Sequence, residues 1–233
     1  MATHRAAGWI SGLALVASGA LMCAASVQRW AGACTWGQRD ATTCLSRQDH
    51  LYDFIAPAAP WAPVGAAAML AGWSLLLLAL AFLPLPQAVS RRRPGFATVA
   101  ATLATVLALT NVAVATLRSA AAGVAVDPVA GDTARVAWVL LPPALLIGLA
   151  VATRGWARAG VVSLVLASPL VAGFTYAVGS YDARPWWEAV SGLLTMVAGA
   201  SVAGAAVGNR RPTPVDDPTA VASSPTTLAD LVT

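Results

Sequence analysis

The sequence lacks lysine altogether and contains little charge of either sign. Its 233 residues include 14 basic residues, all arginine, with 10 acidic residues and two histidines, so charged residues amount to only 10%. A soluble domain carries about 25% charged residues, and an apolar share of 58% is too high for a disordered chain. Three cysteines are too few for a small secreted scaffold held by disulfides. The composition therefore indicates a polytopic membrane protein.

Six long apolar stretches contain none of the charged residues. They are 18 to 23 residues long, close to the roughly 20 that a helix needs to cross the hydrocarbon. Lipid offers no partner for backbone polar groups, so each stretch must be helical. We expect an all-α, six-span transmembrane helix bundle as one membrane domain over residues 1–208, followed by a disordered tail, 209–233. The predicted spans are 8–28, 64–83, 95–117, 136–153, 159–179 and 189–208.

Prolines interrupt two of these spans. Pro142 and Pro143 lie in the fourth span and Pro169 lies midway along the fifth. Because proline lacks the backbone N–H and clashes with the preceding turn, both helices are expected to bend.

The arginines predict the orientation. Two very short connections, 90–94 and 154–158, hold five arginines close to the membrane, and short arginine-rich loops face the cytoplasm. Both termini are then cytoplasmic, the outer loops are 29–63, 118–135 and 180–188, and the location is the inner or plasma membrane. An N-terminal signal peptide cleaved after Ser26 is an alternative reading of the first span.

Most tryptophans fall near the span ends, where aromatic side chains form belts at headgroup depth. The outer belt would contain Trp30, Trp36, Trp61, Trp138, Trp186 and Trp187, and the inner belt would contain Trp9 and Trp156.

Two cysteines share the first outer loop, 29–63. Cys34 and Cys44 lie there, whereas Cys23 lies in the first span. An oxidising exterior favours a Cys34–Cys44 disulfide, and closing so short a loop contributes roughly 2–3 kcal/mol on the chain-entropy model. Thiol exchange with Cys23 is a weaker alternative, because the sequence has no Cys-x-x-Cys pair.

The same loop holds the densest polar cluster. Asp49, His50 and Asp53 are candidate ligands for a divalent metal, or His50 and Asp53 are an acid–base pair. The competing interpretation is a solvated loop whose charges pair with Arg39 and Arg47. No cofactor or metal is expected, because zinc sites usually need more histidines.

A short amphipathic helix is expected in this loop. Leu51, Phe54 and Ile55 follow the helical spacing that gives one apolar stripe. Thr42 or Thr43 would cap its start, and Pro57 would end it.

The predicted spans have no acidic, basic or histidine side chain, which argues against an ion-coupled carrier. Asn111 is expected to form an interhelical hydrogen bond. A path for a neutral molecule would be lined by Asn111, Thr105, Thr110 and Tyr176.

Small residues repeat on two spans, where they would let helix backbones approach closely. Gly8 and Gly12 open the first span, and Ala200, Gly204 and Gly208 run along the sixth. We expect packing within the chain, with a homo-oligomer or a partner helix as the alternative.

No phosphate-binding loop, zinc-protease motif or serine nucleophile motif occurs, and no basic folded domain is present to bind nucleic acid. The leading hypothesis is a structural or accessory membrane protein, not an enzyme, that binds the lipid bilayer and a protein or lipid partner. One alternative is a carrier for a neutral or lipophilic molecule. The other is an outer-face enzyme that uses Asp49, His50 and Asp53.

Overall fold

The computed structural model describes residues 2–34, 41–48, 56–59, 61–90, 93–177 and 185–208, and this part of the chain folds into helices without a strand. The all-α prediction is confirmed. In chain order the helices are α1 (Ala2–Trp30), α2 (Thr42–Gln48), α4 (Ala67–Phe82), α5 (Leu85–Val89), α6 (Phe96–Ala122), α7 (Gly131–Ala152), α8 (Gly155–Leu166), α9 (Pro169–Ala177) and α10 (Trp187–Gly208).

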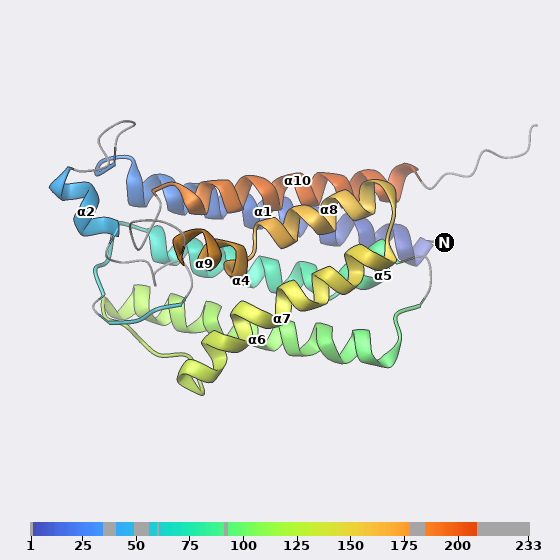
Figure 1. Cartoon of the computed structure of the whole chain (residues 1–233), viewed down its shortest axis with the longest axis horizontal. Helices are drawn as coiled ribbons and strands as arrows, with labels where there is room; N and C mark the ends of the chain where they lie inside the picture. Colours follow the sequence, from blue (N-terminus) through green and yellow to red (C-terminus); the bar gives the residue numbers. More distant parts are fainter. Residues whose placement is uncertain are drawn as a thin grey trace, which may run out of the picture.

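The long helices pack as a closed ring that follows the order of the chain. Each of α1, α4, α6, α7 and α8 contacts the next, and α10 packs against both α8 and α1. The contact between α1 and α10 is the most extensive. Figure 1 shows the N-terminus and the end of α10 at one end of the bundle, and α2 at the other. We call these the N-terminal end and the α2 end.

Each of the six predicted spans contains helix, but the fifth is interrupted. The helix α8 ends at Leu166, and α9 begins at Pro169. Pro169 has no N–H to donate, and its ring clashes with the carbonyl one turn earlier. The expected bend is therefore a complete break at Ala167 and Ser168. In contrast, α7 continues through Pro142 and Pro143.

Glycines bring α1 and α10 into backbone contact. A Cβ on Gly12 would lie 2.8 Å from the Gly199 carbonyl oxygen, and a Cβ on Gly8 would lie 2.6 Å from the Ala206 Cβ. Packing of Gly8 and Gly12 within the chain agrees with the expectation. The predicted stripe on α10 does not, because Gly204 and Gly208 have no neighbouring atom within 4 Å of an added Cβ. The packed face of α10 instead carries Gly192 and Gly199.

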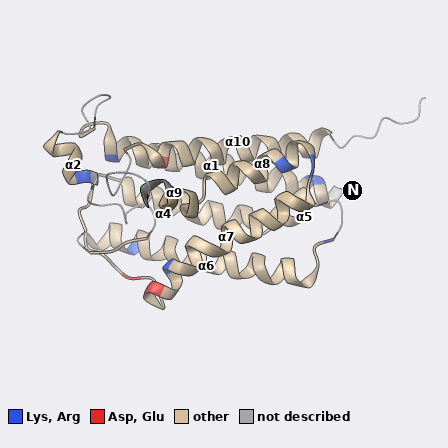
Figure 2. Ribbon diagram, in the orientation of Figure 1, with Lys and Arg blue, Asp and Glu red and all other residues tan. Residues whose placement is uncertain are grey.

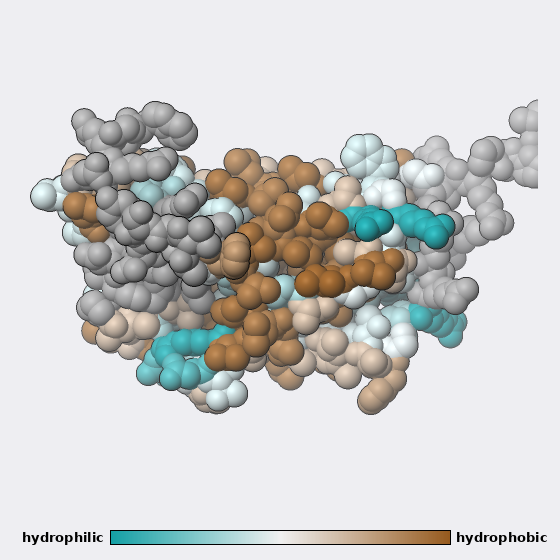
Figure 3. All heavy atoms as spheres, viewed as in Figure 1, coloured by the Kyte–Doolittle hydropathy of each residue, from teal (hydrophilic) through white to brown (hydrophobic). Residues whose placement is uncertain are grey.

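The surface of the bundle is apolar between two charged ends. Figure 2 shows the described arginine and acidic residues gathered toward the ends, and Figure 3 shows apolar atoms across the middle of one face. Leu13, Leu107 and Leu193 point outward and are more than half exposed. Within the described residues, four helices are long and apolar enough to cross a membrane, and α4 and α8 are shorter apolar helices. The apolar helices indicate an integral membrane protein.

Candidate functional site: a cavity beneath a buried ion pair

A cavity of about 40 Å³ lies inside the ring, between α1, α4, α7, α10 and the break between α8 and α9. Apolar side chains form most of its wall. It exceeds the roughly 10–15 Å³ that one buried water needs. The polar residues that line it are Ser18, Ser74, Trp138, Ser168, Ser191 and Thr195.

Two polar groups in this wall have no hydrogen-bond partner among the described residues. They are the indole Nε1 of Trp138 and the Oγ of Ser168, and the two residues are only 3% and 5% exposed. Leaving a buried donor unsatisfied costs about 1–3 kcal/mol. A molecule in the cavity that offered acceptor atoms would remove this cost.

The other hydroxyl groups of the cavity wall are satisfied by neighbouring backbone. The Ser18 Oγ and the Ser74 Oγ each donate to the other residue's carbonyl oxygen, at 2.8 Å, and thereby join α1 to α4. The Ser191 Oγ donates to the Ala167 carbonyl oxygen at 2.8 Å. Ala167 is the C-terminal cap of α8, and the last carbonyl groups of a helix need partners from outside it. The break between α8 and α9 thus supplies the Ala167 carbonyl that anchors α10 and the Ser168 Oγ that has no partner among the described residues.

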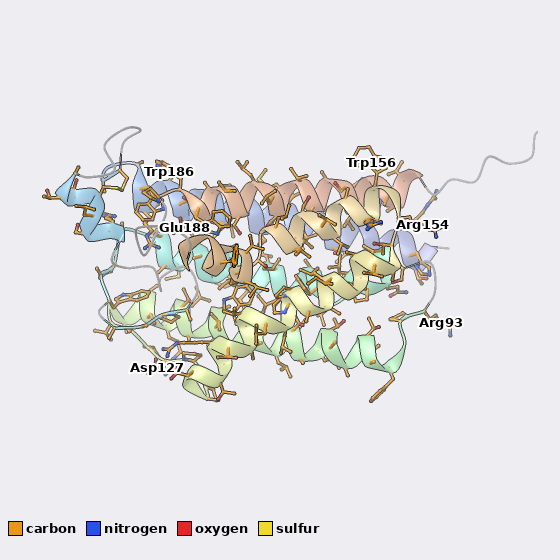
Figure 4. All side chains as sticks on the ribbon, in the orientation of Figure 1. Arg93, Asp127, Arg154, Trp156, Trp186 and Glu188 are labelled. Atoms are coloured by element: carbon orange, nitrogen blue, oxygen red, sulfur yellow. A yellow bond between two sulfur atoms is a disulfide. The ribbon has the colours of Figure 1, made fainter. Side chains whose placement is uncertain are left out.

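A buried ion pair lies between the cavity and the α2 end. The Arg29 Nη1 donates to the Glu188 Oε1 at 2.9 Å, and both side chains are 6% exposed. The Trp30 indole donates to the other Glu188 oxygen at 2.7 Å. Figure 4 shows Glu188 and Trp186 toward the α2 end, with Arg154 and Trp156 at the opposite end. The pair joins the last turn of α1 to the first turn of α10.

The helix α2 is tied to the same cluster. The Arg47 Nη1 donates to the Arg29 carbonyl oxygen at 2.9 Å, and the Arg29 Nη2 donates to the Arg47 carbonyl oxygen at 3.3 Å. The Arg29 guanidinium also lies 4.6 Å from the centre of the Trp30 ring, within the range of a cation–π contact. Arg29 is therefore held on several sides at once.

A second pocket, of about 30 Å³, lies beside the ion pair. Arg29, Glu188 and Trp61 line it together with small residues at the start of α4. Met22 lines both this outer pocket and the cavity, so the two spaces share one flexible side chain in their walls.

The sulfur atoms of Cys34 and Cys44 lie 2.05 Å apart, the length of a disulfide bond. This bond holds α2 near the end of α1. Thr43 does not cap α2 but donates to the Ala33 carbonyl oxygen at 3.3 Å. The Trp186 indole donates to the Cys34 carbonyl oxygen at 3.3 Å, which connects the bridge to the start of α10.

The Cys34→Ser variant is expected to lose roughly 2–3 kcal/mol of stability through the larger entropy of its unfolded chain. Mass spectrometry of the native protein after thiol alkylation should find Cys34 and Cys44 linked and Cys23 alkylated. A Cys23→Ser variant is the matched control and should keep wild-type stability. Finding Cys34 and Cys44 alkylated without reduction would contradict the disulfide, and with it an oxidising location for the α2 end.

No family model, curated protein or solved structure matches this chain.

Several candidate residues of the first outer loop lie outside the described residues. These are Asp49, His50, Asp53 and Arg39, together with the stripe of Leu51, Phe54 and Ile55, so their grouping remains a prediction. Among the residues that the structure describes, no group of three or more histidine, cysteine or acidic residues could hold a metal ion.

The cavity is not lined by the residues that the sequence suggested. The Asn111 Nδ2 donates to the Val129 carbonyl oxygen at 2.8 Å, and the Val129 N–H donates to the Asn111 Oδ1 at 3.0 Å. Asn111 therefore holds the connection from α6 to α7 rather than joining two helices or lining a cavity. Thr105 is buried but lies outside the cavity wall, and the side chain of Tyr176 is not among the described ones.

Four residues of the observed site were assigned other places from the sequence. Arg29 and Glu188 were expected in outer loops, and Trp30 and Trp138 in an aromatic belt, yet all four are buried. One signal in the sequence was available. A base directly after the first span and an acid directly before the last one are candidates to pair, if the first and last helices are neighbours.

Proposed function

We propose that the protein is a membrane-embedded binding protein whose partner is a small, neutral, lipophilic molecule held inside the helix ring. The observation that carries the proposal is the cavity with two buried, unpartnered donors, Trp138 Nε1 and Ser168 Oγ. The sequence suggested an accessory protein that binds a protein or lipid partner, and the proposal takes the second of these.

The chemistry of the cavity wall supports a neutral ligand. No charged side chain is among the described residues that line it, and an unpaired charge at membrane depth costs several kcal/mol. The two free donors favour a molecule with carbonyl, ether or hydroxyl oxygen atoms, because these accept hydrogen bonds without carrying charge. The many apolar side chains around them favour a body of hydrocarbon.

Transport of this molecule across the membrane is the second candidate function. The break between α8 and α9 supports it, because discontinuous helices line the substrate sites of many transporters near the middle of the bilayer. The ligand would then leave the cavity toward either side. The outer-face enzyme that uses Asp49, His50 and Asp53 has no support from the described residues.

We propose that the protein lies in the inner or plasma membrane and that its N-terminal end faces the cytoplasm. Arg93 and Arg154 support it, since they lie in short connections at that end (Figure 4), where positive charge favours the cytoplasm. Arg158 follows in the first turn of α8. The disulfide at the α2 end supports it as well, because disulfides persist in oxidising surroundings.

The proposal predicts that a neutral lipophilic molecule copurifies with the protein. We expect solvent extraction of protein in lipid nanodiscs, followed by mass spectrometry, to find one compound enriched over the bulk lipid. Ser168→Leu should abolish the enrichment by filling the cavity. Trp138→Phe should weaken binding about fivefold to tenfold, because one hydrogen bond contributes roughly 1 kcal/mol.

Two matched variants control this experiment. Ser163→Leu makes the same change on α8, at a hydroxyl that bonds its own helix away from the cavity. Trp156→Phe makes the same change at an indole that is 72% exposed. Both should retain the compound in full. If no compound is enriched, or if Ser168→Leu retains it as Ser163→Leu does, the proposal is wrong.

A further inference from the structure

The outer pocket and the cavity lie one after the other along three helices. On α1, Ser18 lines the cavity, Met22 lines both spaces, and Arg29 lines the outer pocket. On α10, Glu188 lines the outer pocket and Ser191, one turn further along, lines the cavity. The two spaces are therefore neighbours in depth, with the outer pocket nearer to the α2 end.

The third helix gives the depth over which the residues that line the two spaces are distributed. On α4, the outer pocket begins at Ala67 and the cavity extends to Phe82. Fifteen residue steps at a helical rise of 1.5 Å correspond to about 22 Å, most of the roughly 30 Å thickness of the hydrocarbon. A compact molecule would occupy only part of this length, whereas a molecule with one long chain would follow it.

We infer that the bound molecule is a single-chain amphiphile without net charge, with its polar head in the outer pocket and its chain extending past Met22 into the cavity. This inference rests on the proposed function and deepens it, because it names the class of ligand and its direction.

The charges of the outer pocket select the head group. Arg29 and Glu188 neutralise one another, so an ionic head of either sign would add an uncompensated charge beside a buried pair, which is costly. An uncharged head with hydroxyl groups avoids that cost. The Trp61 indole Nε1, which has no partner among the described residues, lines this pocket and offers a donor to such a head.

Met22 is suited to the boundary between the two spaces. Its side chain is 7% exposed and lines both spaces. Methionine is unbranched and has three rotatable bonds, so it adapts to irregular gaps. In the inferred complex, the Met22 side chain rotates to let the acyl chain pass from the outer pocket into the cavity.

Two photoactivatable monoacylglycerol probes test the inference. One carries the diazirine at the end of its chain and the other carries it beside the head. In protein reconstituted in phosphatidylcholine nanodiscs, mass spectrometry should find the chain-end probe on peptides with Trp138 or Ser168. The head-side probe should label peptides with Trp61 or Ala68. Excess unlabelled monoacylglycerol should reduce both signals at least fivefold, and a fatty acid of equal length should not.

Met22→Trp supplies the decisive variant, because a larger side chain should close the boundary. We expect it to reduce labelling of Trp138 and Ser168 peptides by the chain-end probe at least fivefold. Labelling by the head-side probe should persist. Ala20→Trp is the matched control, since Ala20 is on the exposed face of the same helix, and it should label as the wild type does.

The outcomes separate the inference from the proposed function. If a compact neutral compound copurifies and both probes fail to label competitively, the cavity binds a ligand but the amphiphile is wrong. If the chain-end probe labels the outer pocket and the head-side probe labels the cavity, the direction is wrong. Equal competition by the fatty acid would overturn the choice of an uncharged head. If neither a copurified compound nor competitive labelling is found, the proposed function fails as well.

Discussion

Replacing Glu188 with glutamine is expected to destabilise the protein by about 3–5 kcal/mol, the usual cost of removing one partner from a buried ion pair. The replacement is nearly isosteric, so the change is almost purely one of charge. It removes the negative charge of Glu188 from beside the buried Arg29 guanidinium. Thermal unfolding of the purified protein in detergent, followed by the fluorescence of its buried tryptophans, would measure the loss.

Two further variants make this result specific. Asp132→Asn alters an ion pair with Arg135 in which the aspartate is 91% exposed, and exposed pairs contribute no more than about 1 kcal/mol. Combining Arg29→Met with Glu188→Gln removes both charges and keeps an acceptor for the Trp30 indole, so it should recover most of the loss. If Glu188→Gln is no less stable than Asp132→Asn, the pair is not buried in the folded protein.

The second large effect is expected from Gly199→Leu on α10. An added Cβ at this position lies 2.5 Å from the Gly12 carbonyl oxygen and 2.9 Å from the Val16 Cγ2. Overpacking usually costs about 1–3 kcal/mol, and here the opposing atom is backbone, which cannot rotate away. We expect a loss of about 3 kcal/mol or more in the same unfolding measurement.

Gly204→Leu is the matched control, because it makes the same change five residues further along α10. An added Cβ there meets no neighbouring atom within 4 Å, so the variant should unfold close to the wild type. Gly199→Ala should give an intermediate loss if Gly199→Leu does not fold. Equal stability of the leucine variants would mean that α10 packs on α1 through a different face.

The positions of the long apolar helices could be predicted from the sequence because charge is excluded from the hydrocarbon along the whole length of a helix. That cost acts on each segment separately, and it requires no knowledge of neighbours. Proline gave one further local feature, since Pro169 interrupts its helix. The presence of a proline could not distinguish a bend from a break. The helix ends before Pro169, whereas α7 continues through Pro142 and Pro143.

The site was much harder to predict, because it depends on which helices are neighbours. Arg29 and Glu188 are 159 residues apart in the sequence, and each by itself resembles an ordinary flanking charge. The burial of Trp138 likewise depends on which face of α7 points into the ring, and an apolar helix in lipid carries little pattern to decide this. Ser191 becomes an anchor only because the break after α8 frees the Ala167 carbonyl.

The closed ring has a consequence for how the chain is made. The helix α1 leaves the ribosome well before α10, its most extensive partner, so the glycine face of α1 and the Arg29 side chain must wait until α10 is synthesised. A nascent chain that stops before α10 keeps an open seam along α1 and a cation without its carboxylate. Such truncated products should be recognisable to membrane proteases, and synthesis of α10 becomes the step that closes the ring.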